Sequence, residues 1–350
     1  MAQDSNESGP AADGAARLLP SEVVGPPDGQ QSPRYSGFST FARLPRSDQI
    51  GRFDVGILGI PFDSGTTYRP GARFGPSAVR AASRLLRPYN PELATSPFAT
   101  QQVVDLGDVD CTPFDISTAI GQIEEAAQGA GAGGARLVAI GGDHTVALPL
   151  LRAIHERVGP VALVHFDAHL DTFDTYMGAA YTHGSPFRRA AEEGRFVGEN
   201  SVHIGIRGSV YEQQDLANDA ALGFTVVTTP DVSRMGTDGV VEVVRRTVGD
   251  LPVYLSIDID VADPAFAPGT GTPEAGGLSS RELLMMVRGL AGLPLAGADV
   301  VEVAPAYDHA EITAGLAANL VFEIVSMMAI DSGLPEASAS RRRAQLGPLR

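Results

Sequence analysis

The fold of this chain is constrained most by short, nearly continuous apolar runs that alternate with helical segments. Runs such as LVAI and VALVHF lack the apolar–polar alternation of a half-exposed strand, so we expect them to be buried on both faces of a parallel sheet. The β-rich runs are Phe53–Ile60, Gln102–Leu106, Arg136–Ile140, Val161–Phe166, Ser201–Ile206, Phe224–Val227, Val253–Ile257 and Asp299–Val303. The helical segments include Thr118–Gly129, Val146–Arg157, Gly239–Thr247 and Ser280–Leu290. This alternation predicts an α/β protein, a three-layer α/β/α fold with an eight-stranded parallel sheet.

Acidic and histidine side chains follow three of these runs directly, and the last run carries a glutamate among apolar neighbours. Residues two apart in an extended stretch share one side, so Asp258 and Asp260 are predicted to face the same way. Ligands of parallel sheets bind outside the carboxyl ends of the strands, where these side chains are expected to meet. The candidate residues are His144, Asp167, His169, Asp171, Asp258, Asp260 and Glu302.

Five carboxylates at one edge of a sheet would repel each other and raise one another's pKa unless cations neutralise them. A dinuclear metal site removes that cost, with Asp167 and Asp258 as natural bridging ligands and one nitrogen per metal from His144 and His169. Such a ligand set is rich in oxygen and has no thiolate, which suits Mn²⁺ better than Zn²⁺. Each motif alone is weak, because a single Asp-x-Asp is more often a buried polar group or a loop cap.

The composition excludes several classes of function. The 350-residue chain contains no lysine, so its 26 basic residues are all arginines, and its formal net charge is −16. The lack of lysine excludes Schiff-base enzymes and Walker-type ATPases. The negative charge argues against nucleic acid as a partner and suits a cationic ligand or metal ions, although solubility alone also explains it. The single cysteine, Cys111, excludes a disulfide framework and favours the reducing cytoplasm.

The chain is expected to hold one large folded domain between two flexible ends. Residues 1–35 are rich in Ser, Gly, Pro, Ala and Gln without periodic hydrophobicity, so we predict a disordered arm rather than a signal peptide. Residues 36–334 form the predicted domain, and residues 335–350, which carry three consecutive arginines, form a predicted flexible tail. The longest uninterrupted apolar run falls short of the roughly 18 residues that a membrane span needs, so we expect no membrane partner.

Six motifs, which occur in order over about residues 53–330, resemble the ureohydrolase (arginase/agmatinase) family. They are GARFGP at Gly71–Pro76, GGDHT at Gly141–Thr145, FDAHLD at Phe166–Asp171, THGSPFRRA at Thr182–Ala190, SIDIDVADPAFAPGTGTPEAGG at Ser256–Gly277 and DVVEVAPAYD at Asp299–Asp308. The resemblance implies an arginase-type α/β/α fold, two Mn²⁺ ions per subunit and a homo-oligomer, commonly a trimer or a hexamer. It also implies hydrolysis of a guanidino compound to urea and an amine.

The family's functional residues carry over position by position. The resemblance implies one ion held by His144, Asp167, Asp171 and Asp258, and a second ion held by Asp167, His169, Asp258 and Asp260. Asp171 would accept a hydrogen bond from the metal-activated water, Glu302 would pair with the guanidinium in bidentate fashion, and His183 would carry a proton to the leaving amine. Thr145 stands where the family usually has serine, and the hydroxyl group is kept.

The sequence says less about which chemical group the substrate carries at the end opposite its guanidinium. Arginases carry an asparagine two residues after the DAHxD motif, and Phe173 at that position disfavours arginase activity. The loop at residues 172–181 carries one anion, Asp174, and no cation, which favours a terminal ammonium next to Asp174 and therefore agmatine, giving putrescine and urea. A hydrolase of 4-guanidinobutyrate, another guanidino acid or guanidine stays open, because Arg69 or Arg207 could reach the substrate.

Two other classes of protein remain as alternatives. A non-catalytic binding protein on the same fold would be expected to have lost a metal ligand, and all six are present. A metal-dependent deacetylase would bind a single Zn²⁺ ion with fewer acidic ligands. Metal analysis therefore discriminates between these alternatives and a ureohydrolase.

Overall fold

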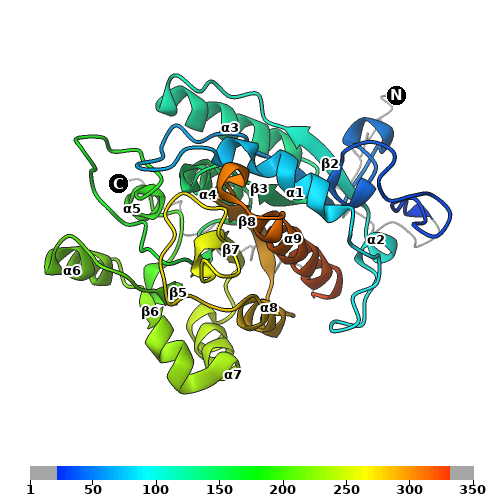
Figure 1. The fold of residues 1–350 in the computed structure, drawn as a ribbon. Coiled ribbons are helices and arrows are strands. Elements are labelled where there is room, and N and C mark those ends of the chain that lie inside the picture. Colours follow the sequence, from blue (N-terminus) through cyan, green and yellow to red (C-terminus); the bar gives the residue numbers. More distant parts are fainter. Residues whose placement is uncertain (1–21, 332–350) are drawn as a thin grey trace, which may run out of the picture.

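The computed structural model describes residues 22–331. Within them lies one sheet of eight strands, all parallel, in the order β2-β1-β3-β8-β7-β4-β5-β6 (Figure 1). The strands are β1 Val55–Gly59, β2 Val103–Asp108, β3 Arg136–Ile140, β4 Ala162–Phe166, β5 Val202–Ile206, β6 Thr225–Thr228, β7 Val253–Asp258 and β8 Leu295–Val301. The helices of this region are α1 Gly75–Ser83, α2 Pro97–Thr100, α3 Ile116–Gly131, α4 Ala147–Val158, α5 Pro186–Glu192, α6 Gln213–Ala221, α7 Thr229–Val248, α8 Ser280–Gly289 and α9 Ile312–Ile330.

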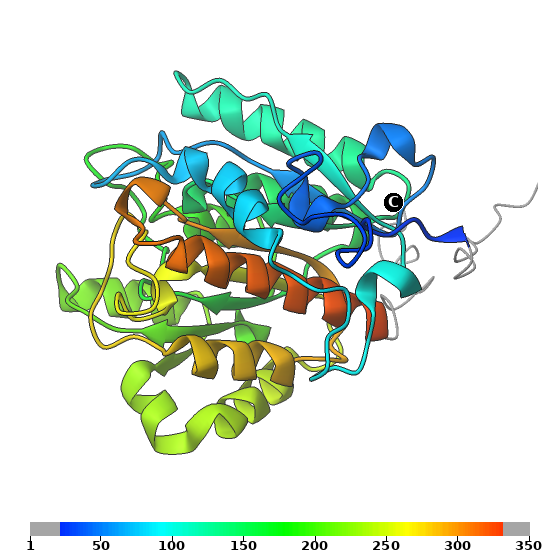
Figure 2. The same cartoon turned by 45° about the vertical axis from the view of Figure 1, so that its right-hand side comes forward.

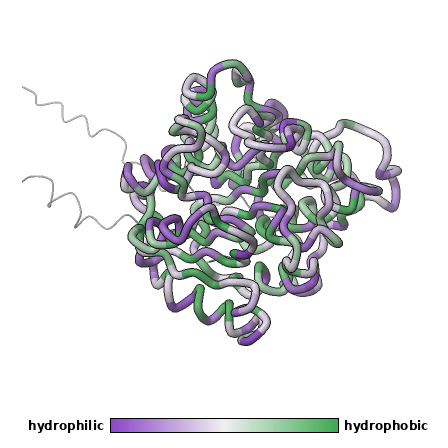
Figure 3. Tube along the Cα trace, turned by 60° about the vertical axis from the view of Figure 1, so that its left-hand side comes forward, coloured by the Kyte–Doolittle hydropathy of each residue, from purple (hydrophilic) through white to green (hydrophobic). Residues whose placement is uncertain are grey.

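Helices cover both faces of the sheet, so the α/β/α prediction is confirmed (Figure 2). Side chains of a strand alternate between its two faces. Val138 of β3 belongs to the core shared with α1, α7, α8 and α9, whereas Leu137 and Ala139 belong to the core shared with α3, α4 and α5. Coloured by hydropathy, the trace alternates between hydrophobic and hydrophilic segments along the chain (Figure 3). Burial on both faces explains why the strand sequences are continuously apolar.

Two elements start more than two residues away from the expected position. The last strand begins at Leu295 and ends at Val301, so Glu302 lies just beyond it, with a φ of 62°. The sequence did not predict the first four residues of this strand, because alanine and glycine, which make up most of them, are poor indicators of a strand. Helix α7 begins at Thr229 rather than at Gly239, with a kink at Gly236, where φ is 71°. A glycine in that conformation interrupts the helical pattern on which the expected start relied.

Helix α9 is almost uniformly apolar because it is a core helix. It is long and apolar enough to cross a membrane, but 78% of that stretch is buried inside the domain. Its one acidic residue, Glu323, accepts hydrogen bonds from Arg288 Nη2 at 2.6 Å and from Asn90 Nδ2 at 2.8 Å. These contacts fix α9 against α8 and the loop after α1.

Residues 22–35, within the segment expected to be a disordered arm, are hydrogen bonded to the domain beside the start of β2. Gln102 exchanges two hydrogen bonds with the backbone of Val24, at 2.8 and 3.0 Å. Arg43 donates to the carbonyl oxygens of Pro27 at 2.6 Å and Pro33 at 3.0 Å. The structure differs here from the expected disordered arm, because Arg43 and Gln102 supply hydrogen-bond partners for the backbone of residues 22–35. Residues 1–21 and the predicted tail at 335–350 lie outside the described residues.

The buried ion pair between Arg80 and Asp105, on the edge strand β2, is expected to contribute to the free energy of unfolding. Asp105 accepts from Arg80 Nε at 2.8 Å and Nη2 at 3.0 Å, and both side chains are buried. Asp105→Asn removes the charge that compensates Arg80, so we expect the free energy of unfolding to fall by about 3 kcal/mol. Urea denaturation measures this loss. Asp108→Asn is the matched control: Asp108 pairs with the same arginine but is half-exposed, and its loss should cost under about 1 kcal/mol.

Candidate active site

The predicted site residues lie at or beyond the carboxyl ends of four adjacent strands in the middle of the sheet: β3, β8, β7 and β4. His144 lies in the turn after β3, and Asp167 follows β4 directly. Asp258 is the last residue of β7 and Asp260 lies in the turn behind it. Because the strands are parallel, their carboxyl ends meet at one edge of the sheet and bring these side chains together.

The first group of side chains surrounds one ring nitrogen of His144. Its Nδ1 atom lies 2.9 Å from Asp171 Oδ2, 3.2 Å from Asp167 Oδ2 and 3.4 Å from Asp258 Oδ2. The ring is fully buried, and this nitrogen has no hydrogen-bond partner among the described residues. The opposite nitrogen, Nε2, is fixed by Ser256 Oγ at 2.8 Å. A buried nitrogen left without a partner and facing three carboxylates is poised to bind a cation.

A second group surrounds His169. Its Nδ1 atom lies 3.3 Å from Asp167 Oδ1 and 3.2 Å from Asp260 Oδ2. Asp167 thus contributes one oxygen to each group, as a bridging ligand does. Asp258 lies with the first group, and its Oδ1 atom accepts the backbone N–H of Asp260 at 2.9 Å.

Both groups fit divalent cations by spacing and by charge. Adjacent ligand atoms about 2.1 Å from one ion lie about 3 Å apart, close to the nitrogen–oxygen separations of 2.9–3.4 Å found here. Burial and the negative charges of Asp260 and Asp167 raise the pKa of Asp258 well above its usual value. Burial and the charge of Asp167 raise the pKa of Asp260 to about 6. Cations would relieve this repulsion.

His183 is held between the acidic residue Glu302 and a hydroxyl group. Its Nδ1 atom lies 2.9 Å from Glu302 Oε1, and its Nε2 atom lies 2.8 Å from Thr67 Oγ1. Burial opposes protonation of the ring, but the hydrogen bond to Glu302 and the charges of Glu302 and Asp171 raise the pKa of His183 to about 9. The ring is therefore disposed to carry a proton at neutral pH.

Glu302 is buried and only half satisfied. Its Oε1 atom accepts from His183 and from the backbone N–H of His144 at 2.9 Å. Its Oε2 atom has no hydrogen-bond partner within residues 22–331. A Cβ atom added to Gly271 would lie 3.7 Å from that oxygen, so the glycine leaves room beside it. One acceptor oxygen thus remains available for a donor.

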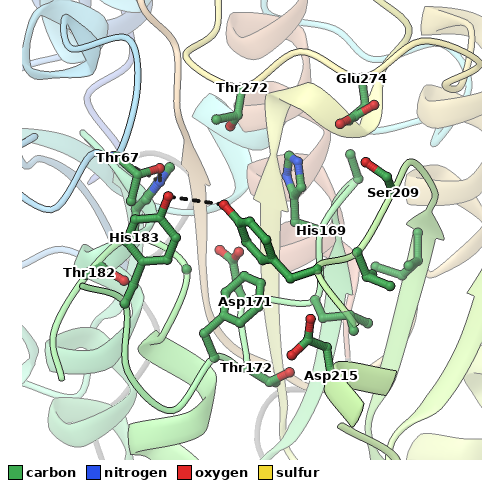
Figure 4. A pocket seen from close by; sticks show the side chains of 18 of the residues that line it. Thr67, His169, Asp171, Thr172, Thr182, His183, Ser209, Asp215, Thr272 and Glu274 are labelled. Atoms are coloured by element: carbon green, nitrogen blue, oxygen red, sulfur yellow. Dashed lines mark hydrogen bonds between the residues drawn. The ribbon is translucent and has the colours of Figure 1, made fainter. Parts of the chain in front are cut away.

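A pocket of about 350 Å³ opens above these groups, and His169, Asp171 and His183 point into it (Figure 4). Asp174 also lines the pocket, but its side chain is 61% exposed and pairs with Arg189 Nη2 at 2.5 Å. The one arginine among the lining residues, Arg207, donates to backbone carbonyl oxygens of its surroundings, including Asp260 O at 2.6 Å. The pocket is therefore acidic, without a free arginine in its wall.

Sequence reasoning missed the polar residues behind the site. His165 on β4 contacts Asp167, with Nε2 and Oδ2 2.8 Å apart, and His203 on β5 contacts His165. Burial lowers the pKa of His165 to about 3, so its ring is neutral. Thr67, the partner of His183, was also missed. A single polar residue within an apolar strand, as in VALVHF and VHIGI, was the available signal for the two histidines.

Comparison with protein families matches residues 53–327 to the arginase family. The chain is 45% identical over 305 residues to guanidinopropionase of Pseudomonas aeruginosa, covering 87% of this chain and 96% of that protein. It is 42% identical over 303 residues to the mitochondrial agmatinase of Gallus gallus, covering 87% and 89% respectively. The solved structure of proclavaminate amidino hydrolase from Streptomyces clavuligerus superposes with a TM-score of 0.82 at 43% identity, covering 85% of this chain and 99% of that one.

Proposed function

The chain belongs to the arginase family and is a hydrolase of guanidino C–N bonds, and we propose that its reaction is the hydrolysis of agmatine to putrescine and urea with two bound Mn²⁺ ions. One observation carries the proposal: the unpartnered Nδ1 atom of buried His144 faces three carboxylates beside a pocket. The oxygen-rich donor set, with one imidazole in each group, suits Mn²⁺. All six candidate ligands are present, which disfavours a non-catalytic binding protein.

The residues that would hold the ions are those of the two groups described above. His144 and Asp171 would hold one ion, His169 and Asp260 the other, and Asp167 and Asp258 would contact both. Two bound cations lower the pKa of a water molecule enough to make it a nucleophile near neutral pH. Asp171, which reaches both the first group and the pocket, would accept a hydrogen bond from that water.

Glu302 would bind the guanidinium of the substrate through its free oxygen. Guanidinium N–H groups form their strongest hydrogen bonds with carboxylates, and Oε2 is the acceptor that the protein leaves unused. The sequence predicts that both carboxylate oxygens of Glu302 bind the guanidinium. Oε1 already accepts hydrogen bonds from His144 and His183, so we propose that the guanidinium binds mainly to Oε2. The same carboxylate thus binds the substrate and orients the ring of His183.

His183 would supply the proton that the departing amine needs. In the protonated ring, Nδ1–H donates to Glu302 and Nε2–H donates to Thr67 Oγ1. In the neutral ring, Nε2 accepts the backbone N–H of Thr67 at 3.2 Å. The surroundings accommodate both protonation states, as a group that carries a proton requires.

The pocket wall supports a substrate with a positively charged far end. Asp174, Asp215 and Glu274 line it, whereas the guanidinium of Arg207 is engaged by backbone carbonyl oxygens. A terminal carboxylate would meet these negative charges without a compensating cation from the lining residues. Asp174 remains the proposed contact for the ammonium group, although its pairing with Arg189 weakens its field.

We expect agmatine to exceed 4-guanidinobutyrate in kcat/KM by about 10–200-fold, the usual range for a mismatch of this size. Urea release across agmatine, 4-guanidinobutyrate, 3-guanidinopropionate, arginine and guanidine measures the order. Asp174→Asn should narrow the gap between agmatine and 4-guanidinobutyrate. A preference for a guanidino acid would contradict agmatine as the substrate and leave ureohydrolysis intact.

A guanidino acid is the second candidate, and one contact favours it. The side chain of Arg69 makes ring contacts with Tyr68 and Tyr307, at 5.5 and 5.3 Å from the ring centroids, and no hydrogen bond within residues 22–331. Its charge is therefore available to a carboxylate. Arg69→Gln discriminates, because it should weaken turnover of 4-guanidinobutyrate only if Arg69 reads the substrate.

Assembly and location complete the proposal. We expect a homo-oligomer, a trimer or a hexamer, with a small guanidino substrate as its ligand and the cytoplasm as its compartment. Sedimentation velocity measures the assembly, and a monomer at assay concentration would contradict it. The related chicken agmatinase is mitochondrial by name, so fractionation of the host cell is the test of location.

A further inference from the structure

A line of buried polar groups runs from Asp167 to helix α6. The pairing of β4 with β5 places His165 directly opposite His203, and both side chains are fully buried. Asp167 Oδ2 lies 2.8 Å from His165 Nε2, and the two Nδ1 atoms of His165 and His203 are 2.7 Å apart. At the far end, His203 Nε2 lies 3.3 Å from Oδ1 of Asp219, which is 2% exposed.

Two hydrogen bonds and one close polar contact make up this line. The carboxylate of Asp167 accepts from His165 Nε2, and the facing Nδ1 atoms of His165 and His203 share the next hydrogen bond. His203 Nε2 lies 3.3 Å from Asp219 Oδ1 and has no hydrogen-bond partner among the described residues. The buried carboxylate of Asp219 thus ends the line at its contact with His203.

The carboxylate of Asp219 also supports Asp171, which is another candidate metal ligand. Thr172 Oγ1 donates to Asp219 Oδ1 at 2.8 Å. Thr172 directly follows Asp171, whose φ of 55° lies in the left-handed region. Aspartate adopts this conformation more readily than most side chains but less readily than glycine, so contacts next to it help to hold the backbone there. Asp219 thus anchors the chain directly after a candidate metal ligand.

We propose that Asp219 is a positioning residue for the metal centre. Through His203 and His165 it orients the carboxylate of Asp167, and through Thr172 it holds the backbone of Asp171. The inference rests on the metal centre proposed above. It follows from the general behaviour of metal sites, in which hydrogen bonds behind the ligands fix their orientation and change metal affinity.

The test measures Mn²⁺ binding itself rather than turnover. Full-length protein is stripped with a chelator and titrated with MnCl₂, and the electron paramagnetic resonance signal of free Mn²⁺ gives the affinity. Asp219→Asn should weaken binding about 10–100-fold, the range typical of residues behind metal ligands. Thr172→Val, which breaks only the branch to Asp171, should weaken it less, and Asp219→Glu, which keeps the charge, should recover part of the loss.

Amide hydrogen exchange of the metal-free protein provides a second readout. Exchange at residues 171–173 should accelerate in Asp219→Asn and in Thr172→Val. If Asp219→Asn fails to fold, the milder Thr172→Val carries the test through both measurements.

Asp105→Asn is the matched control, since it loses a buried carboxylate at the opposite side of the sheet, on the edge strand β2. It should lower stability and leave the Mn²⁺ affinity unchanged. Affinities within twofold of wild type for both Asp219→Asn and Thr172→Val would overturn the inference, as would an equal weakening in Asp105→Asn. Wild-type protein that binds no Mn²⁺ would overturn the proposed metal centre as well.

Discussion

Asp258→Asn is expected to lower kcat/KM by about a thousandfold or more and to remove most of the bound metal. A carboxamide is neutral, so the variant lacks one of the negative charges that would hold the two cations. A thousandfold fall in kcat/KM corresponds to a loss of about 4 kcal/mol in the metal-dependent stabilisation of the transition state, because each 1.36 kcal/mol changes the rate tenfold. Elemental analysis should find two Mn²⁺ ions per chain in the wild type and fewer than one in the variant.

Asp263→Asn is the control for this substitution, because Asp263 lies in the same loop without facing the cluster. Its carboxylate accepts backbone N–H groups of Ala265 at 2.9 Å and Gly276 at 2.8 Å. It should keep both ions. Retention of two ions in Asp258→Asn, or an equal loss in the two variants, would show that Asp258 is not a ligand.

The raised pKa values in the cluster give this prediction a pH dependence. In the metal-free protein, the pKa of Asp260 is raised to about 6, so its protonated form stabilises the folded state at low pH. That contribution is lost as the pH rises through about 6, and the pKa of Asp258 shifts in the same direction. Bound cations favour the ionised forms instead. The difference in melting temperature between Mn²⁺-loaded and chelated protein should therefore widen from pH 5 to pH 7.5.

The site could be predicted from the sequence where its residues stand next to strand ends. Asp167 and Asp258 fall at the ends of β4 and β7, so recognising two apolar strands was enough to bring them to one edge of the sheet. The contacts behind the site depend on register across strands. His165 meets His203 because β4 and β5 pair in one alignment, and no local pattern fixes that alignment.

Contacts between distant loops escaped prediction for a related reason. Thr67 and His183 are 116 residues apart, and each lies in a loop whose path depends on the packing of the whole domain. Glu302 was identified, but its position beyond β8 was not, because the small residues that begin the strand gave a weak signal. Its φ of 62° turns the side chain out of the strand pattern and towards His144 and His183.

His183→Ala should retain both metal ions and lose about 10²–10⁴-fold in kcat, the usual contribution of a positioned general acid. The ring lies 2.9 Å from Glu302 and contacts no candidate metal ligand, so metal content separates this variant from Asp258→Asn. The pKa of His183 is raised to about 9 in the metal-free protein, so its proton is present below that pH and lost above it. Two cations nearby would lower this value. Wild-type kcat should therefore decline on the alkaline side at or below pH 9, and His183→Ala should lose that decline.

Thr67→Val is the matched control for His183→Ala, since it keeps the hydrogen bond between His183 and Glu302 and removes only the hydroxyl partner of Nε2. One hydrogen bond of about 1 kcal/mol corresponds to a loss of about fivefold. An alkaline decline that persists in His183→Ala would place the titrating acid elsewhere. A loss of metal in that variant would instead make His183 part of the metal centre, because a side chain that only carries a proton can be removed without disturbing the ions.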